Sequence, residues 1–426
     1  RKMLDVMKPT TQQTSSHGRL VFVAICAMSL FATIGAAMPY PILAPIFVDG
    51  SVDAFTHFWG LPPKLLMGIA LAVNPLGILL GSLVIGALSD HHGRRRVLLL
   101  TLAVTLIGTL LSAYALYVRN YPIFVLARFI TGLAEGNIAI SRALVADLFE
   151  DAAQRMRGFA LLNAMNYMGW LLGPVLGGAA LLLGEPAPFL LAGLLLVPCW
   201  LVLSIGLPAD AKQPPNATPV WALLRNPPLL GLLRNNRMLA QAACLHFTYT
   251  LGLTAFYEFE PLWMLESLGF GSGKIALAVA AQCACMTAAS LLVGRFGTSP
   301  TPLRRVAGAA SLSALGMIAL SLMPNVWGLA ILIGLGAPLA VYAAAFPAWL
   351  SKRFEEHGQG LVMSMMGTMF CLSNVVVAMV GSILSLWSTA LVLGLGGLVI
   401  GWAAWAYFQL SRDQNELSNT TPLEQT

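Results

Sequence analysis

Several ionisable side chains lie inside long apolar stretches of this chain, where charge is expensive to place. They are Arg128, Glu135, Arg142, His246, Glu258 and Glu260. A charged group at the centre of a membrane-spanning helix costs about 2.5–3.5 kcal/mol on insertion scales, and such residues mark functional sites by default. Since desolvation disfavours the charged form of a carboxylate, a Glu in this setting can take up and release a proton. We predict that Glu135, with Glu258 or Glu260, couples proton entry to the transport of another solute. His246 titrates near neutral pH and is a further candidate, with a hydrogen-bonded packing role as the alternative.

The spacing of these residues indicates how they face their surroundings. Arg128, Glu135 and Arg142 recur every seven residues, a spacing that drifts only about 20° around a helix, so we expect all three on one face. Successive members lie about 10.5 Å apart along the axis, which makes them a ladder rather than direct ion pairs. Glu258 and Glu260 are two residues apart and therefore point to roughly opposite sides of their helix. One of the two is expected to face the transport path, and spacing alone leaves open which.

The composition shows why the positions of the few charged residues are informative about structure and function. Of 426 residues, 58% are hydrophobic and 10% are charged, against about 25% charged in a typical soluble chain. This excludes a soluble enzyme, a nucleic-acid-binding protein and a disulfide-stapled secreted domain. A membrane-spanning helix needs about 20 apolar residues, and the chain contains twelve apolar segments of about that length or longer. They cover approximately residues 20–47, 65–88, 97–118, 122–148, 158–183, 187–207, 239–265, 273–294, 304–323, 326–350, 359–383 and 387–409.

Lysine and arginine are distributed asymmetrically among the loops. If both termini lie on one side, 19 of the 24 lysines and arginines fall on that side, two lie within a span, and Lys64, Arg119 and Lys274 fall on the other side. Cytoplasmic loops carry the excess of positive charge, which predicts a multi-pass protein with both termini cytoplasmic, in a bacterial inner membrane. We expect a cytoplasmic tail (1–18), a six-helix bundle (19–207), a cytoplasmic linker (208–238), a second six-helix bundle (239–410) and a cytoplasmic tail (411–426). The linker contains either a helix lying on the membrane surface or an ordinary basic loop.

One loop carries a motif that points to a family. It reads Gly86-Ala-Leu-Ser-Asp90-His-His-Gly93-Arg94-Arg-Arg, which resembles the signature G-x-L-x-D-R-x-G-R-[RK] of the major facilitator superfamily. Gly86 lets two helices approach closely, Gly93 permits a tight turn, and Asp90 lies at a helix end within reach of arginines. His91 stands where the signature has Arg, which removes one permanent charge from the loop.

Two further stretches sharpen this resemblance. Gly169-Trp-Leu-Leu-Gly173-Pro174-Val-Leu-Gly177-Gly178 is similar to the G-x-x-x-G-P-x-x-G-G pattern of exporters and proton antiporters in the family, and generic small-residue packing is the alternative. Arg128-Phe-Ile-Thr-Gly132 is similar to the R-x-x-x-G pattern of its drug/proton antiporters. The residues expected to act in conformational change are Gly86, Asp90, Gly93, Arg94, Asp147, Gly173, Pro174, Gly177 and Gly178.

The resemblance implies an all-α membrane protein with twelve transmembrane helices in two pseudo-symmetric six-helix bundles, which rock about a central cavity by alternating access. Spans one, four, seven and ten line that cavity in the family. The residues in these and neighbouring spans that we expect to line it are Arg128, Asn137, Tyr40, Asn166, Tyr249, Tyr257 and Tyr342. Span one holds no carboxylate, although many multidrug antiporters place one there. The predicted substrate is therefore a small amphipathic drug-like compound or an anionic or zwitterionic metabolite.

The leading prediction is a secondary active exporter, a proton antiporter that uses the proton gradient and no cofactor. Its expected partners are a small-molecule substrate and the lipid bilayer, without nucleic acid, and the expected oligomeric state is a monomer. Two alternatives stay open: a proton-coupled importer of a nutrient or metal chelate, and a non-transporting membrane receptor. The sequence shows no nucleophile–base constellation, metal-ligand cluster or P-loop, so neither an enzyme nor ATP-driven transport is expected.

Overall fold

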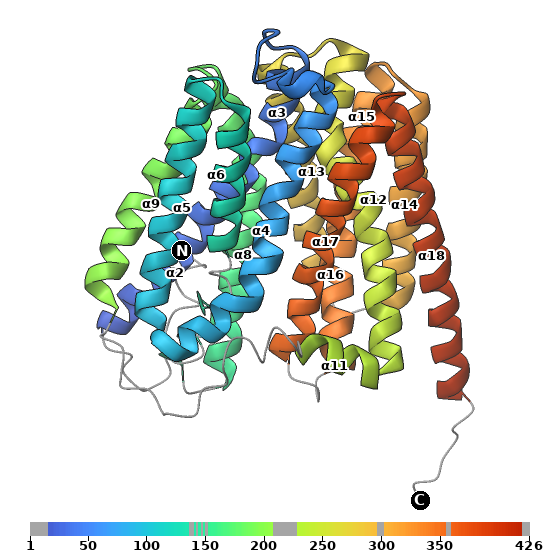
Figure 1. The fold of residues 1–426 in the computed structure, drawn as a ribbon. Helices are drawn as coiled ribbons and strands as arrows, with labels where there is room; N and C mark the ends of the chain where they lie inside the picture. The colour runs from blue at the N-terminus through green and yellow to red at the C-terminus, as the bar shows by residue number, and fades with distance from the viewer. Residues whose placement is uncertain are drawn as a thin grey trace, which may run out of the picture.

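The computed structural model describes residues 16–135, 140–141, 144–145, 148–149, 152–207, 228–295, 302–354 and 359–419. Within these ranges the regular secondary structure is helical, and the helices form two bundles that lie side by side (Figure 1). The first bundle contains α2 (Ser16–Ala37), α3 (Pro39–Val48), α4 (Pro63–His92), α5 (Arg94–Tyr117), α6 (Tyr121–Ala134), α8 (Ala152–Leu181) and α9 (Ala187–Gly206). The second contains α12 (Arg237–Leu268), α13 (Ser272–Arg295), α14 (Pro302–Leu322), α15 (Val326–Gly334), α16 (Gly336–Arg353), α17 (Gln359–Ser385) and α18 (Thr389–Asn419). Two short helices, η1 (Phe58–Gly60) and α11 (Pro228–Asn235), lie in connections.

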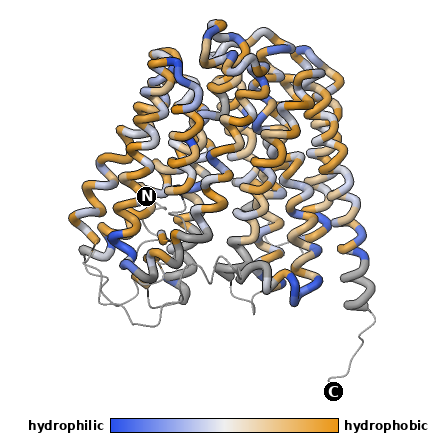
Figure 2. Tube along the Cα trace, in the orientation of Figure 1, coloured by the Kyte–Doolittle hydropathy of each residue, from blue (hydrophilic) through white to orange (hydrophobic). Residues whose placement is uncertain are grey.

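The predicted all-α membrane fold is confirmed. Hydrophobic residues run along most of the length of the helices, and hydrophilic residues gather toward their two ends (Figure 2). Among the described residues, nine helical stretches are long and apolar enough to cross a membrane, with α2 and α3 counted as one stretch and α15 and α16 as another. Helices α6, α8 and α12 lie among them in Figure 1 and complete six membrane-crossing segments in each bundle.

Local sequence signals set the ends of the helices that carry the candidate site. Asn120 caps α6, because its side chain accepts a hydrogen bond from the backbone N–H of Ile123. Asn236 caps α12 in the same way through Leu239. Gly269 ends α12 with a φ of 62°, in the left-handed region that glycine adopts without steric cost.

The two ends of the bundles differ in how the bundles meet. We call one end the Arg119 end, because it holds the loops 49–62, 118–120, 182–186 and 269–271 (top of Figure 1). The opposite end is called the Arg94 end, after the first residue of α5, which follows the α4–α5 turn at Gly93. The ribbons of the two bundles approach each other at the Arg119 end and separate toward the Arg94 end (Figure 1).

The hydrophobic core follows the same division. One cluster of buried residues joins both bundles, and its first-bundle members come from segments near the Arg119 end, among them Phe47, Leu66 and Phe124. These pack in one continuous core with second-bundle residues such as Phe259 and Leu262. A separate cluster fills the Arg94 half of the first bundle alone; it includes Ile25, Leu98, Val145 and Leu203. The described packing therefore closes the Arg119 end between the bundles.

Close contact between α4 and α6 brings polar groups of the two helices together. A Cβ atom on Gly132 would overlap the carbonyl oxygen of Asn74, and one on Gly81 would overlap that of Leu133. A Cβ atom on Gly77 would lie 2.6 Å from the carbonyl oxygen of Phe129. Only glycine permits this approach, in line with the small-residue interfaces of membrane helices.

Replacing Gly132 with Ala is expected to destabilise the protein, because the added methyl group must push α4 away from α6. Overpacking of a well-packed interior costs typically about 1–3 kcal/mol. The measurement is the thermal unfolding midpoint of the purified protein in detergent, which should fall. Gly308→Ala in α14 is the matched control, since a Cβ atom there meets no atom within 4 Å. Equal midpoints for the two variants would contradict the close packing.

Candidate functional site

Glu135 lies at the end of α6 and is held by a neighbouring helix. The helix ends at Ala134 with Glu135 as its C-cap, within the apolar segment 122–148, so the expectation that residues 128, 135 and 142 share one face of a single helix does not hold at this point. The residue that follows is Gly136, and glycine is the commonest residue just after a helix. The Asn74 side-chain amide of α4 donates to Glu135 Oε2 at 3.1 Å and to the backbone oxygen of Arg128 at 3.3 Å. Asn74 therefore fixes the carboxylate relative to both helices.

Arg128 supplies positive charge to the same pocket of the first bundle. Its side chain is buried, and its guanidinium lies 6.0 Å from the centre of the Phe189 ring in a cation–π arrangement. The charge of Arg128 acts on Glu135, and the salt bridges found among the described residues include none between the two, in line with a ladder rather than a direct ion pair. Arg142, the third member of the predicted ladder, lies outside the described residues.

Glu135 also lies near the second bundle. Cys371 of α17 lies near it, and the adjacent Phe370 meets Trp170 of α8 edge to face, with ring centres 5.7 Å apart. One residue further along α8, the backbone oxygen of Leu171 lies 3.8 Å from the thiol of Cys283 in α13, which belongs to the second bundle. The carboxylate thus lies where the bundles meet between the two ends, and a rocking motion of one bundle would change its surroundings.

The two glutamates of α12 are both buried but have different surroundings. With its amide nitrogen facing α12, Gln282 of α13 donates to both carboxylate oxygens of Glu260, at 3.2 and 3.3 Å. Glu258 is 2% exposed, and among the described residues neither of its oxygens has a hydrogen-bond partner. The two glutamates therefore differ in hydrogen bonding, a difference that their spacing in the sequence does not reveal.

His246 belongs to a hydrogen-bonded network inside the second bundle. Its Nδ1 lies 3.0 Å from the hydroxyl of Tyr342 in α16, which lies 2.9 Å from the hydroxyl of Tyr407 in α18. The ring of His246 stacks on Phe346, and Tyr249 stacks on Tyr342. His246, Tyr249 and Tyr342 are buried in helix packing here, so the roles predicted for them in proton coupling and in lining the cavity stay predictions.

The remaining cavity candidates are scattered. Asn166 of α8 accepts hydrogen bonds from the hydroxyls of Ser29 and Thr33 of α2, at 2.6 and 3.1 Å. The Tyr257 hydroxyl is 3.8 Å from the sulfur of Met286 in α13. Tyr40 lies in α3 with its side chain outside the described part of the chain, and Asn137 falls outside it altogether.

The predicted motif residues are placed as follows. Gly93 has a φ of 95° and joins α4 to α5, which explains the glycine, and Arg94 begins α5. Gly86 and Asp90 lie in the last turns of α4 with side-chain positions outside the description, and Asp147 is not described. In α8, which contains Pro174, the glycines mark close approaches. A Cβ atom on Gly173 or Gly177 would crowd the backbone at the α2–α3 junction, and one on Gly178 would overlap Ala276 of α13.

Three polar residues near this site were missed by the sequence reasoning. Asn74, Gln282 and Ser373 lie in the interiors of apolar helices, and each contacts a polar group of another helix. A search for amides and hydroxyls as well as charges within the apolar segments could have found them, because any polar group in such a helix needs a partner.

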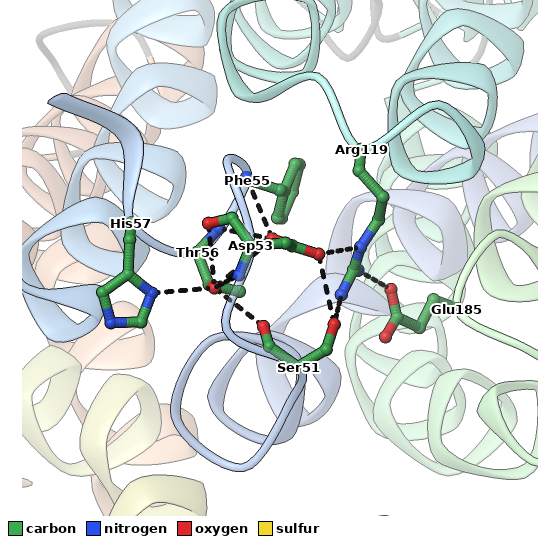
Figure 3. Close-up of polar contacts among 7 residues, drawn as sticks. All are labelled: Ser51, Asp53, Phe55, Thr56, His57, Arg119 and Glu185. Carbon is green, nitrogen blue, oxygen red and sulfur yellow. Dashed lines mark hydrogen bonds and ion pairs between the residues drawn. The ribbon is translucent and has the colours of Figure 1, made fainter. Parts of the chain in front are cut away.

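A second polar cluster ties together three loops at the Arg119 end (Figure 3). Arg119 donates through Nε to Asp53 at 2.6 Å and through Nη2 to Ser51 at 2.6 Å, and it forms an ion pair with Glu185. Asp53 also accepts hydrogen bonds from the backbone N–H groups of Phe55 and Thr56. All of these residues belong to the first bundle, so the cluster orders its loops and does not join the bundles.

The charges of this cluster shift one another. Burial raises the pKa of Asp53, but the backbone N–H of Thr56 and the charge of Arg119 together bring it below its ordinary value. For Glu185, burial and repulsion by Asp53 outweigh the attraction of Arg119, so its pKa lies above the ordinary value. The lowered pKa of Asp53 stabilises the folded state above the pKa of the unfolded chain, and this contribution is lost as the pH falls toward the folded-state value.

Replacing Asp53 with Asn is expected to lower thermal stability at neutral pH, because the ion pair is lost while the side-chain oxygen can still accept from Phe55 and Thr56. The deficit should stay constant from about pH 7 down to about pH 4, the ordinary pKa of Asp, and shrink below that as Asp53 of the native protein becomes protonated. Thermal unfolding of both proteins across this range is the measurement. Asp49→Asn in the same loop is the control, since no side-chain hydrogen bond of Asp49 is found in the described part of the loop. A deficit that does not change with pH would contradict the assignment.

Comparisons with known proteins agree on one family. The family model described as Major Facilitator Superfamily matches residues 20–376. Tetracycline resistance protein, class B, of Escherichia coli is 32% identical over 191 residues, which cover 45% of this chain and 43% of that protein. Major facilitator superfamily domain-containing protein 10 of Homo sapiens is 34% identical over 180 residues, covering 39% of this chain and 37% of the relative. The aligned regions span less than half of the length of either relative.

A solved structure extends the likeness over the whole fold. The crystal structure of the human organic anion transporter MFSD10 (TETRAN) superposes with a TM-score of 0.68 and 20% identity, covering 93% of this chain and 100% of that chain. At this identity the likeness concerns the fold alone.

Proposed function

This chain belongs to the major facilitator superfamily, and from that membership we propose that it is a proton-coupled exporter. As a member of the family it is a multi-pass membrane transporter of small molecules rather than an enzyme. The proposed energy source is the proton gradient, with no cofactor, and the proposed location is a bacterial inner membrane with both termini cytoplasmic. The Arg94 end then faces the cytoplasm, in agreement with the excess of positive charge on that side.

The observation that carries the proposal is the position of Glu135. Its carboxylate is held by Asn74, lies in the field of Arg128, and is near Cys371 of the other bundle. A proton carrier needs a carboxylate whose surroundings differ between the two conformations of the transporter, and a residue between the rocking bundles meets this requirement. A carboxylate within one rigid bundle would keep the same neighbours in both states.

The charge of the first bundle supports an anionic or zwitterionic substrate. Arg128 is buried beside Glu135, and protonation of Glu135 would remove a negative charge that competes with a carboxylate or phosphate group of the substrate for the arginine. Small amphipathic drug-like compounds remain within the proposal. Export rather than import is supported by the sequence likeness to a tetracycline resistance protein and by the glycine–proline pattern of α8.

The experiment has two steps. Metabolites inside and outside cells with and without the protein identify a substrate, whose uptake is then measured in inverted and right-side-out vesicles. An exporter accumulates the substrate in inverted vesicles with an acidic lumen, and dissipating the pH gradient stops the accumulation. Uptake only into right-side-out vesicles with acid outside would identify an importer. Binding without flux in either orientation would identify a receptor.

A further inference from the structure

The buried Glu258 side chain has no hydrogen-bond partner on the described helices that surround it. Its carboxyl group is 2% exposed, and neither oxygen meets a hydrogen-bond donor among the described residues. An ionised carboxylate in such a position loses its hydration and gains nothing in return, so the neutral acid is the form that fits. Glu260, two residues away, differs because Gln282 donates to both of its oxygens.

The position of Glu258 connects it to the contact between the bundles. Thr250, Thr254 and Glu258 follow one another at intervals of four residues and share one face of α12. The Thr250 hydroxyl lies 2.8 Å from that of Ser373, which places this face beside α17. α17 in turn packs against α4 of the first bundle, where a Cβ atom on Gly68 would overlap Ser382.

About two turns beyond Glu258 along α12, Glu266 pairs with a lysine of the first bundle at the Arg119 end. Lys64 of α4 forms an ion pair with Glu266 of α12, with Nζ and Oε1 2.6 Å apart, and donates to the backbone oxygen of Ser385 in α17 at 2.6 Å. We call this arrangement the Lys64 clasp. Glu258 therefore lies below the clasp, at the α12–α17 contact that the clasp holds against α4.

Among the residues that the structure describes, no cationic side chain is placed to compensate a charge on Glu258. The sequences of α3 and α17 contain no Asp, Glu, Lys, Arg or His. The charged residues of α18 and α11 lie at the Arg94 end, beginning with Arg412 and Arg234. In α13, Lys274 is near the first turn, Cys283 interacts with Glu260, and Arg295 is at the far end. Lys64 and Glu266 are engaged with each other. On α12 itself, Arg237 is at the Arg94 end and the Nδ1 of His246 lies 3.0 Å from the Tyr342 hydroxyl.

We infer that protonation of Glu258 permits the Arg119 end to close. Closure buries the acid beneath the Lys64 clasp; opening admits water, and the O–H bond of the acid breaks to give a hydrated carboxylate and a proton in that water. Low pH at the Arg119 end then favours closure, and a proton taken up from that side stays on the acid while the end is closed. This inference rests on the proposed proton coupling and assigns to Glu258, rather than Glu260, the control of opening at the Arg119 end.

The test measures how fast a buried cysteine becomes reactive. Ser382→Cys is introduced after the six native cysteines are replaced, because Ser382 is fully buried against α4 when the end is closed. The purified protein in lipid nanodiscs is treated with a polar maleimide across the pH range. Val52→Cys, at a side chain that is 81% exposed, corrects for the intrinsic pH dependence of the thiol reaction.

With Glu258 intact, the corrected rate should rise by roughly tenfold or more from about pH 5.5 to about pH 8.5, since one linked proton shifts an equilibrium by up to about tenfold per pH unit. Glu258→Gln, which imitates the neutral acid, should label slowly at every pH, whereas Glu260→Gln should keep the pH response. Glu258→Met, of similar length, is expected to behave like Glu258→Gln and guards against a folding defect particular to the amide.

The possible failures are distinguishable. A pH response that persists in Glu258→Gln and Glu258→Met but disappears in Glu135→Gln would overturn this inference and leave proton coupling through Glu135 intact. If the pH response instead disappears in Glu260→Gln, the responsible residue is Glu260 and the assignment to Glu258 is wrong. Labelling that is independent of pH in the protein with both glutamates would contradict the inference and the proposed proton coupling together.

Discussion

Replacing Glu135 with Gln is expected to reduce transport driven by a pH gradient to the level of vesicles without the protein. Gln has the shape of the protonated acid and can still accept the hydrogen bond that Asn74 donates at 3.1 Å, so the packing of α4 against α6 should survive. What it cannot do is release a proton. The bundles can therefore still exchange substrate, but a pH gradient no longer gives the exchange a direction.

The measurement separates these two activities in one preparation. Substrate accumulation under a pH gradient should disappear in Glu135→Gln, while exchange of labelled for unlabelled substrate without a gradient should continue. Glu185→Gln is the control, because that carboxylate lies in a loop of the Arg119 cluster, away from the bundle interface. Accumulation at the normal rate in Glu135→Gln would rule out this residue as the proton carrier.

Replacing Lys64 with Gln is expected to leave the Arg119 end open for a much larger fraction of the time. The variant loses the ion pair with Glu266 and the charged hydrogen bond to Ser385, which are direct polar contacts between the bundles at this end. A hydrogen bond to a charged group contributes about 1.5–3 kcal/mol, and about 1.4 kcal/mol is tenfold in an equilibrium constant. The shift toward the open state should therefore be about tenfold to a hundredfold.

The Ser382→Cys reporter measures this shift directly, and labelling in the Lys64→Gln background should be fast even at low pH. Export should slow, since the closed state is less populated. Lys274→Gln is the matched control, because Lys274 lies at the same end but faces Phe270 of its own bundle, 5.5 Å from the ring centre. Labelling that stays slow at low pH in Lys64→Gln would mean that hydrophobic packing alone holds the end closed.

The membrane fold could be predicted from the sequence because it depends on properties read along one helix at a time. Twelve apolar segments, the asymmetry of lysine and arginine, and the loop from Gly86 to Arg96 are local patterns, and the bilayer leaves few ways to satisfy a backbone across its thickness. The same reasoning identified Arg128 and Glu135, since charge within an apolar helix is visible without a structure.

What the sequence could not decide is which helices meet. Helical periodicity tells which residues share a face but not which neighbour that face meets, and Lys64 and Ser385 are 321 residues apart in the chain. Only the packing shows that Asn74 holds Glu135, that Gln282 accompanies Glu260, and that Glu258 has no described partner. The end of α6 at Ala134 was missed for a related reason, because heptad spacing continues past a helix end that lies within an apolar segment.

The sequence by itself therefore determined the class of protein and the short set of charges on which we propose that transport depends, because burying a charge in a membrane is costly whatever surrounds it. The tertiary structure decided how those charges differ, because the state of a buried carboxyl group depends on the donors within hydrogen-bond distance of it. Those donors come from helices that meet only in the folded molecule.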